Sequence, residues 1–281
     1  MIVFYADLDN TLLYSYRHDI GHDKVGVETY QGRTISFMTS YAYELLNRLR
    51  EQVMFIPVTT RTREQYERIR LGSSPPYALV CNGGVLLDHG QEDTAWYENS
   101  VKLTTGARDA LCRGREYMER DPHRIFEVRC VRELFLFTKS AEPREMVKNL
   151  RDRLDGGSVD IFQNGEKVYI VPVQLNKGMA CRRVRERLGM KKIYTVAAGD
   201  SGFDVPMLRA ADLFLAPAAL CDAYDLQGGE IWSGEEGIFS DFILRHLSGY
   251  LSALSDGERE SGLFSASRSS SIRSSSPGWS K

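Results

Sequence analysis

The sequence predicts an α/β protein in which a parallel sheet carries helices on both faces and an α+β unit is inserted into the chain. Short apolar runs of strand type alternate with amphipathic helical patterns towards both ends of the 281 residues. Polar motifs follow several of these runs directly, and ligands of parallel sheets bind beyond the carboxyl ends of the strands. The middle of the chain instead contains pairs of strands with helices between them, which is typical of a separate α+β unit.

The first part of the chain begins the alternating pattern. Its strand candidates are residues 2–6, 53–58 and 77–81. Its helix candidates are residues 40–52 and 64–71, the first with apolar side chains at helical spacing. The polar stretch at about residues 14–33 is predicted to be an exposed flap. Its two His-Asp pairs, His18-Asp19 and His22-Asp23, are assigned to this flap rather than to a metal site, because nothing in the sequence fixes their geometry.

The inserted unit is predicted to span residues 85–175. Two strands are expected within residues 124–138, and a hairpin that turns at Asn164-Gly165 is expected within residues 158–173. Helices are expected at about residues 105–120 and 143–154.

The α/β pattern resumes after the insert. The expected elements are a helix at 177–188, a strand at 193–198, a helix at 205–211, a short strand at 213–216 and a closing helix at 238–251. Twelve of the last thirty residues are serine, so residues 252–281 are predicted to be a disordered tail. The core domain would then comprise residues 1–84 and 176–251.

The composition excludes several classes of protein. A hydrophobic content of 42% and a net charge of -2 are typical of a globular domain and give no argument for a nucleic-acid or membrane partner. The five cysteines are scattered without C-x-x-C spacing, which indicates reduced thiols and a cytoplasmic protein. No signal peptide or membrane helix is predicted. The sequence contains no signal for the oligomeric state.

Two carboxylates stand at the end of the first predicted strand. Asp7 and Asp9 follow the apolar run Ile-Val-Phe-Tyr-Ala, where unpaired charges are costly unless a cation or chemistry compensates them. Residues two apart on an extended chain lie on the same side. A turn or helix cap would explain such a pair taken alone. Together with the motifs below, the pair predicts a nucleophile and a proton donor beside a metal ion.

Further polar motifs occupy equivalent places along the chain. They are Thr-Thr-Arg at 59–61, Asn-Gly-Gly at 82–84, Asn-Lys-Gly at 176–178 and Gly-Asp-Ser-Gly-Phe-Asp at 199–204. Each alone is weak, because a polar strand end, a solvated lysine or a helix cap would explain it. Their order, at three predicted strand ends and one helix start, is specific.

Taken in order, four of these motifs (7–11, 59–61, 176–178 and 199–204) resemble those of the haloacid dehalogenase superfamily of phosphotransferases, over most of residues 1–250. The α+β insert between the second and third motifs resembles the C2-type cap of this superfamily, on a Rossmann-like core. The size of the insert and the Gly-Asp-Ser-Gly-x-Asp form are similar to the sugar-phosphatase branch, which includes sucrose-phosphate phosphatases and Cof-type hydrolases.

The resemblance implies a division of roles among the motif residues. Asp7 would be the nucleophile that forms an aspartyl-phosphate, and Asp9 would be the acid and base, for which its pKa should be raised. Thr59 would bind a phosphoryl oxygen, and Lys177 would supply positive charge. The remaining candidates for contact with phosphate or substrate are Asn10, Thr60, Arg61, Asn82 and Gly83.

The resemblance also implies a Mg²⁺ site rich in oxygen ligands. Its ligands would be the Asp7 carboxylate, the Asp9 backbone carbonyl and Asp200, with Asp204 completing or orienting the cluster. The chain departs from the pattern twice. Thr60 stands where relatives usually have glycine, and Phe203 stands where they often have asparagine, which replaces a polar contact near the site.

The implied function is a Mg²⁺-dependent phosphatase of a small phosphorylated metabolite, a sugar or polyol phosphate. Hydrolysis of phosphate monoesters needs accelerations of up to about 10²¹, and one general base supplies only ~10²–10⁴, so a full set of groups is required. A sugar phosphomutase and a non-catalytic regulatory protein on the same scaffold are the alternatives. The candidate specificity residues in the insert are Arg129, Arg132 and Lys167.

Overall fold

The protein is described by a computed structural model that covers residues 1–189 and 193–268, with side chains through residue 254. Its main sheet has five parallel strands in the order β15-β14-β13-β1-β5. These strands are β1 (Ile2–Ala6), β5 (Val53–Pro57), β13 (Tyr194–Ala198), β14 (Leu213–Pro217) and β15 (Glu230–Trp232). The predicted α/β class with a parallel sheet is confirmed.

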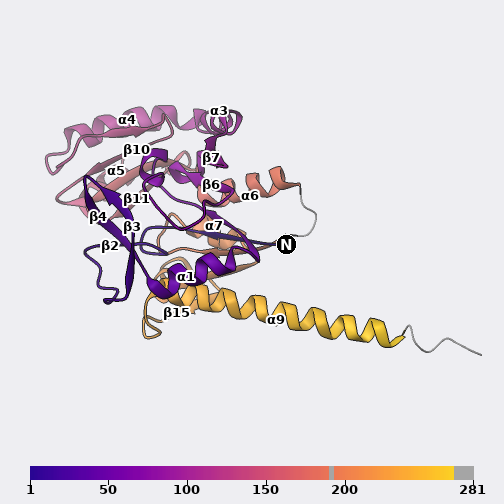
Figure 1. The fold of residues 1–281 in the computed structure, drawn as a ribbon. Coiled ribbons are helices and arrows are strands. Elements are labelled where there is room, and N and C mark those ends of the chain that lie inside the picture. Colours follow the sequence, from indigo (N-terminus) through magenta and orange to yellow (C-terminus); the bar gives the residue numbers. More distant parts are fainter. Residues whose placement is uncertain (190–192, 269–281) are drawn as a thin grey trace, which may run out of the picture.

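The alternation of side chains in β1 divides the core between two faces. Phe4 and Ala6 pack with α1 (Ser40–Leu49) and α9 (Phe239–Arg268), whereas Val3 and Tyr5 pack on the opposite side. The helices of that opposite side are α6 (Lys177–Leu188), α7 (Val205–Ala210) and α8 (Ala218–Tyr224). Both faces of the sheet are therefore covered (Figure 1).

The predicted flap is a small antiparallel sheet. Strands β2 (Tyr14–Ser15), β4 (Arg33–Thr39) and β3 (Lys24–Tyr30) pair in that order. Polar and apolar residues alternate in β3 and β4, so these strands were not recognised within a polar stretch of sequence. Their residues Val27 and Met38 are buried in the core beside α1. The flap is thus anchored to the core rather than fully exposed.

The third predicted strand lies in another sheet. β6 (Tyr77–Val80) pairs with β7 (Val85–Asp88), which pairs with β8 (Gln91–Glu92). β6 meets the segment after β5 through a bridge between Val58 and Leu79 and does not extend the ladder of the main sheet. Helix α2 (Arg63–Tyr66) is shorter than the predicted 64–71, because the chain after it pairs with β3: the N–H of Arg70 donates to the carbonyl of Val27 at 2.7 Å.

The inserted unit is a four-stranded antiparallel sheet backed by helices on one side. The strand order is β11 (Val159–Asn164), β12 (Lys167–Pro172), β10 (Phe135–Lys139) and β9 (Arg129–Val131). The helices on that side are α4 (Arg108–Arg120) and α5 (Pro143–Arg151), whereas α3 (Thr94–Leu103) packs beside β7 through Trp96. The β11–β12 hairpin turns at Asn164-Gly165 as predicted, with Gly165 at φ 56°.

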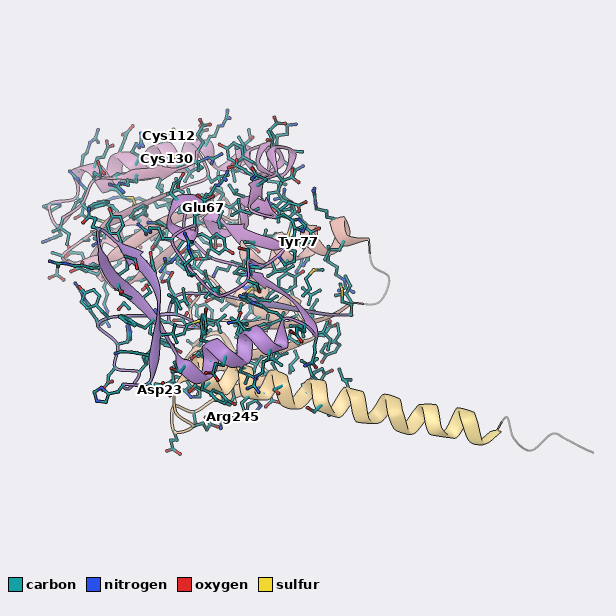
Figure 2. All side chains as sticks on the ribbon, in the orientation of Figure 1. Asp23, Glu67, Tyr77, Cys112, Cys130 and Arg245 are labelled. Atoms are coloured by element: carbon teal, nitrogen blue, oxygen red, sulfur yellow. The ribbon has the colours of Figure 1, made fainter. Side chains whose placement is uncertain are left out.

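The C-terminal helix is longer than expected. α9 continues past Ser252 to Arg268, through residues that include the helix formers Ala253 and Leu254. The expected disorder therefore does not describe residues 252–268, and residues 269–281 of the predicted tail lie outside the described residues. None of the described helices has the length and apolar character to cross a membrane. The five cysteines are free thiols, of which Cys112 and Cys130 are exposed on the inserted unit (Figure 2).

Candidate active site

Parallel pairing brings the first, second and fourth motifs to one edge of the main sheet. Asp7 follows β1, and its N–H donates to the carbonyl of Ala198 in β13 at 2.9 Å. On the other side of β1, the N–H of Val58 donates to the carbonyl of Ala6 at 2.8 Å, so Thr59 comes next at the same edge. The predicted meeting of these motifs follows from the aligned carboxyl ends of neighbouring strands.

Lys177 joins two carboxylates in the buried centre of the site. Its Nζ lies 2.5 Å from Asp7 Oδ1 and 2.5 Å from Asp204 Oδ1, and its side chain is 1% exposed. Burial opposes the charged form of Lys177, but the charges of Asp204 and Asp7 outweigh it and raise the lysine pKa. Lys177 is therefore a permanent cation between two acidic motifs that are 197 positions apart in the sequence.

Helix α6 holds Lys177 at its first position. The Asn176 side chain caps the helix by accepting from the N–H of Met179 at 2.8 Å. Gly178 lets α6 approach α7 closely, because a Cβ at this position would lie 2.2 Å from the carbonyl oxygen of Pro206. The close packing of α6 on α7 at Gly178 thus determines how far the Lys177 side chain extends into the site.

We expect Gly178→Ala to destabilise the protein by about 1–3 kcal/mol, because the methyl group would push against backbone that cannot move aside cheaply. Gly249→Ala in α9 is the matched control, since nothing lies within 4 Å of its added Cβ. That control should stabilise the helix by up to about 1 kcal/mol. Urea unfolding of the two variants measures both values. Equal stability of the two variants would show that the α6–α7 contact does not constrain Gly178.

Asp204 organises the loop that carries Asp200. It is fully buried, and its Oδ2 accepts from the N–H of Asp200 at 3.1 Å and from the N–H and Oγ of Ser201 at 3.0 and 2.8 Å. Gly199 leaves room for this carboxylate, because a Cβ there would lie 2.4 Å from Asp204 Cβ. Asp204 therefore uses one oxygen for the loop and the other for Lys177.

Asp7, Asp200 and Asp204 form a compact set of oxygen donors, called here the carboxylate cluster. One oxygen of each lies within 4.8 Å of the others. Burial and the charge of Asp204 raise the pKa of Asp200 to about 7. Burial raises the pKa of Asp7, although the charge of Lys177 opposes this. The neighbouring charges of Asp204 and Asp200 raise it further. Carboxylates that repel one another in this way fit a hard divalent cation such as Mg²⁺.

Asp9 is held apart from the carboxylate cluster by Arg61. Arg61 Nε donates to Asp9 Oδ2 at 2.8 Å, and Nη2 donates to Oδ1 at 2.6 Å, which is a bidentate ion pair. Enclosure by protein would raise the pKa of Asp9, but the hydrogen bonds and charge of Arg61 lower it. The expected raised pKa is therefore wrong for this arrangement, because the dominant neighbour of Asp9 is a cation rather than another carboxylate.

Glu28 is a site residue that the sequence did not reveal. It lies on β3, is 2% exposed, and accepts from Arg61 Nη1 at 2.8 Å and from Ser36 Oγ at 2.6 Å. Arg68 Nε lies 3.1 Å from its other oxygen. A single glutamate in a polar stretch gives no periodic signal, so only the fold shows that the flap supports Arg61.

The other predicted phosphate contacts divide into two groups. Thr59 is fully buried and its Oγ1 accepts from the N–H of Arg61 at 3.1 Å, while Thr60 is half-buried beside it. Asn10 adopts φ 61° in the turn after Asp9, where its N–H donates to the carbonyl of Leu13 at 2.8 Å. These three residues lie in the loops that surround Asp7 and Asp9.

Asn82 and Gly83 form the second group, at the junction between the core and the inserted unit. Asn82 Nδ2 donates to the carbonyl of Leu175 at 2.9 Å, and its buried Oδ1 has no hydrogen-bond partner among the described residues. Gly83 packs against α6, since a Cβ there would lie 2.3 Å from Ala180 Cβ. Asn82 also contacts the second motif, because its N–H donates to the carbonyl of Thr59 at 2.9 Å, and neither Asn82 nor Gly83 is part of the carboxylate cluster.

Phe203 connects the Asp200 loop to the inserted unit. Its ring stacks on Phe162 of β11 with centroids 4.2 Å apart and meets the edge of Tyr169 of β12 at 5.0 Å. The aromatic residue that replaces a polar one in this motif therefore serves as a contact between the two parts of the protein.

The three candidate specificity residues differ in position. Arg132 forms a bidentate pair with Glu92 at 2.7 and 3.1 Å and stacks on Tyr97, so it supports the base of the insert. Arg129 pairs with Glu127 at 2.6 Å on the outer strand. Lys167 is on β12, two residues before Tyr169, whose ring meets Phe203 of the Asp200 loop, and its charge helps to lower the pKa of Asp9.

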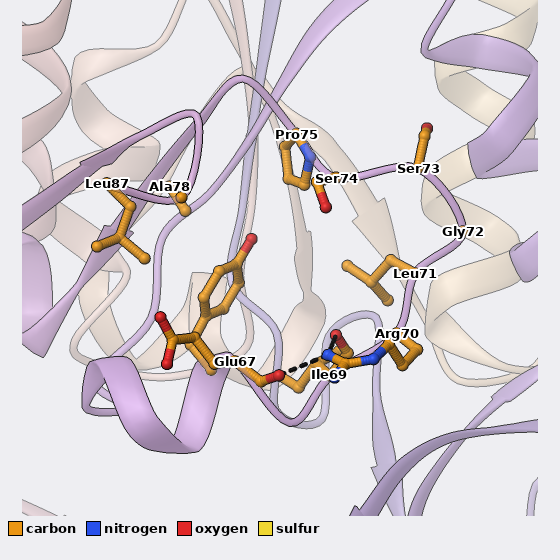
Figure 3. Close-up of a pocket in the computed structure, with 12 residues that line it drawn as sticks. Glu67, Ile69, Arg70, Leu71, Gly72, Ser73, Ser74, Pro75, Ala78 and Leu87 are labelled. Atoms are coloured by element: carbon orange, nitrogen blue, oxygen red, sulfur yellow. Dashed lines mark hydrogen bonds between the residues drawn. The ribbon is translucent and has the colours of Figure 1, made fainter. Parts of the chain in front are cut away.

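A separate hollow of about 240 Å³ lies along the chain after α2 (Figure 3). Glu67, Arg70 and Leu71 are among its lining residues, and Arg70 is occupied by a hydrogen bond to the Glu67 carbonyl. None of the sequence-predicted site residues lines this hollow. Its polar groups do not converge on a reacting centre, so the carboxylate cluster is the better candidate for chemistry.

A family model for haloacid dehalogenase-like hydrolases matches residues 90–216, which include Lys177, Asp200 and Asp204. Two curated relatives are the phosphoglycolate phosphatases of Methanopyrus kandleri and Sulfurisphaera tokodaii. The first is 29% identical over 143 residues, which cover 50% of this chain and 58% of the relative. The second is 24% identical over 180 residues, which cover 62% and 70%. The matched region is thus little more than half the length of the first relative.

The solved sucrose-phosphatase of Synechocystis sp. PCC6803, in complex with sucrose and phosphate, has a similar fold. Its TM-score is 0.61 at 18% identity, and the match covers 89% of this chain and 97% of that one. The likeness extends over both the parallel sheet and the inserted unit, and at this identity it concerns the fold alone.

Proposed function

We propose, on the basis of the family match over residues 90–216, that this chain is a haloacid dehalogenase-like hydrolase and acts as a Mg²⁺-dependent phosphatase of a small phosphorylated metabolite. The observation that carries the proposal is the buried bridge from Lys177 to Asp7 and Asp204, with Asp200 completing the carboxylate cluster. The names of the curated relatives support phosphate ester hydrolysis. In this proposal the core comprises residues 1–84 and 176–251, and residues 85–175 are a C2-type cap.

Asp7 is the proposed nucleophile. Lys177 occupies its Oδ1, which leaves Oδ2 to attack phosphorus. The bond from phosphorus to the ester oxygen breaks as the bond to Asp7 forms, and the departing oxygen takes a proton from Asp9. Water then attacks the aspartyl-phosphate, gives its proton to Asp9, and releases inorganic phosphate and free Asp7.

The ion pair with Arg61 makes the protonation of Asp9 sensitive to substrate binding. Without substrate, the bidentate pair stabilises the Asp9 carboxylate. A phosphate dianion competes for the same guanidinium, and its negative charge raises the pKa of a nearby carboxyl group. Asp9 would then hold the proton that the leaving oxygen needs.

The carboxylate cluster would hold Mg²⁺, together with the backbone carbonyl of Asp9. A bound Mg²⁺ would screen the repulsion between the carboxylates and the phosphate and stabilise charge on the phosphoryl oxygens. Thr59, Thr60 and Asn10 lie in the surrounding loops, where their polar groups are the proposed phosphate contacts.

The proposal is tested by release of inorganic phosphate from a panel of sugar, polyol and hydroxy-acid phosphates. We expect turnover with Mg²⁺ and loss of turnover in EDTA, restored by excess Mg²⁺. Isomerisation of a sugar phosphate without phosphate release would identify a mutase instead. Full activity in chelator, or no hydrolysis of any ester, would contradict the proposal.

The same metal should stabilise the fold in a pH-dependent manner. Because the pKa of Asp200 is raised to about 7, protons compete with Mg²⁺ below that pH, so the rise in Tm on adding Mg²⁺ should shrink from pH 8 to pH 6. In the metal-free protein the sign is opposite. A folded-state pKa above the unfolded value near ~3.9 favours folding at low pH, and this contribution is lost as pH rises through about 7. Differential scanning fluorimetry with and without EDTA measures both trends.

A further inference from the structure

One face of the cap sheet points towards the core, and the alternation of β12 identifies it. Tyr169 and Val171 belong to the apolar cluster that contains Phe203 of the core. Val168 and Ile170 belong to the cluster formed with α4 and α5 on the opposite face. Lys167 is two residues before Tyr169 and therefore lies on the core-facing side.

The neighbouring strand places a second lysine on the same side. Phe137 pairs with Tyr169 and Lys139 pairs with Lys167 in the antiparallel register of β10 and β12. The rings of Phe137 and Tyr169 stack with centroids 5.7 Å apart. The core-facing surface of the cap sheet thus presents the stacked rings of Phe137 and Tyr169, with Lys139 and Lys167 side by side at the end of the same two strands.

The loops that carry Asp9 and Asp200 lie on the side towards which this surface faces. Phe203, in the Asp200 loop, contacts Phe162 and Tyr169 of the cap sheet, and Thr11 Oγ1, two residues after Asp9, donates to Asp200 Oδ1 at 3.2 Å. Burial, with the charge of Asp9, raises the pKa of the Tyr169 hydroxyl. Enclosure by protein lowers the pKa of Lys167, and the negative charge of Asp9 partly offsets this by raising it. The positive charges of Lys139 and Arg61 lower it further. Two residues of β12 therefore lie on the side of the cap sheet that faces the loops of the site, and a leaving group protonated by Asp9 would extend towards them.

The charges around this space do not balance. Lys167 makes no ion pair within the described part of the chain, and although protein encloses part of its side chain, the rest remains exposed to solvent. Lys139 reaches Glu166 only at 3.8 Å. Asp9 is already matched by Arg61, whose remaining partner is Glu28. A lysine crowded by other cations and lacking an acidic partner is a receptor for an anion.

We propose that Lys167, assisted by Lys139, binds a second anionic group, a carboxylate or a phosphate, on the alcohol portion of the substrate. The preferred substrates would then be small esters with a negative charge besides the phosphate that is removed, rather than neutral sugar or polyol phosphates. This inference rests on the proposed function, because it places the leaving group beside Asp9.

Three esters on one two-carbon skeleton test the proposal: phosphoglycolate, 2-hydroxyethyl phosphate and ethane-1,2-diol bisphosphate. They carry a carboxylate, a neutral hydroxyl and a second phosphate at the same place. The wild-type protein should have a higher kcat/KM for at least one anionic ester than for the neutral one, and the larger of the two values identifies the anion. In Lys167→Gln the ratio of anionic to neutral kcat/KM should fall roughly tenfold or more, as expected for loss of a charged hydrogen bond.

Lys148→Gln is the matched control, because Lys148 is exposed on α5, which packs on the other face of the cap sheet. This control should keep the wild-type ratio. A wild-type preference for the neutral ester, or an unchanged ratio in Lys167→Gln, would overturn the inference. If none of the three esters is hydrolysed, their dissociation constants on the Asp7→Asn protein, with and without Lys167→Gln, still decide whether Lys167 selects an anion. Absence of turnover on the wider ester panel would separately refute the proposed function.

Discussion

Asp7→Asn is expected to lower the rate of phosphate release by on the order of 10⁴- to 10⁶-fold, the range typical of losing an enzymatic nucleophile. An amide nitrogen or oxygen cannot form the aspartyl-phosphate, although asparagine has the same shape. Its Oδ1 can still accept the hydrogen bond from Lys177, and Asp204 still neutralises that lysine at 2.5 Å. The loss should therefore be one of chemistry rather than of folding.

The stability of the Asp7→Asn variant supplies the second half of this test. Burial raises the pKa of Asp7, which means that the folded protein favours the neutral side chain more than the unfolded chain does. In EDTA at pH 8 the variant should be at least as stable as the wild type. Asp109→Asn on α4, which is exposed, is the control for the substitution itself. More than about 1% residual activity, with phosphate release shown to come from the variant, would remove Asp7 from the role of nucleophile.

Lys177→Met is expected to lower the free energy of unfolding by about 3–5 kcal/mol in the metal-free protein, the usual cost of leaving buried partner charges uncompensated. The side chain is 1% exposed, and its Nζ contacts both Asp7 and Asp204. The loss should be larger at pH 8 than at pH 6, because protonation of the carboxylate cluster relieves the repulsion at the lower pH. Urea unfolding at both pH values in EDTA measures it.

The cation site predicts a partial rescue of the Lys177→Met variant. Mg²⁺ at the carboxylate cluster would neutralise part of the charge that the lysine leaves behind, so the metal should stabilise the variant more than it stabilises the wild type. Lys148→Met, at an exposed position on α5, should show neither the loss nor the rescue. A Lys177→Met protein as stable as the wild type at pH 8 would mean that the lysine does not compensate these carboxylates.

The sequence predicted the parts of the site that depend on strand order. Asp7, Thr59 and Asp200 each follow an apolar run, and the ends of parallel strands meet at one edge, so their proximity follows from the pattern. Lys177 does not end a strand, and only the family resemblance distinguished it from a solvated lysine at a helix start. The hairpin at Asn164-Gly165 was predictable because its turn residues are specific.

The parts that were missed depend on pairings between distant segments. Glu28 acts through Arg61, which is 33 residues away, and neither residue signals the other in a single sequence. The pKa of Asp9 is lowered instead of raised because of its bidentate ion pair with Arg61, which is another pairing between distant segments. The composition of β6 suits either a parallel sheet or an antiparallel hairpin, so the sequence pattern placed it in the parallel sheet. The short turn to β7 instead pairs it antiparallel with that strand.

The hydrogen bond between Asn82 and Leu175 has a consequence for the architecture of the chain. These residues lie at the two ends of the inserted unit, 93 positions apart, yet the amide nitrogen lies 2.9 Å from the carbonyl oxygen. The chain therefore leaves and re-enters the core at one point, and the core strands need no rearrangement to admit the insert. Any module whose own ends lie a few ångström apart has the geometry to be grafted here, so the insert could be exchanged as a unit while Asp7, Lys177 and Asp200 stay in place.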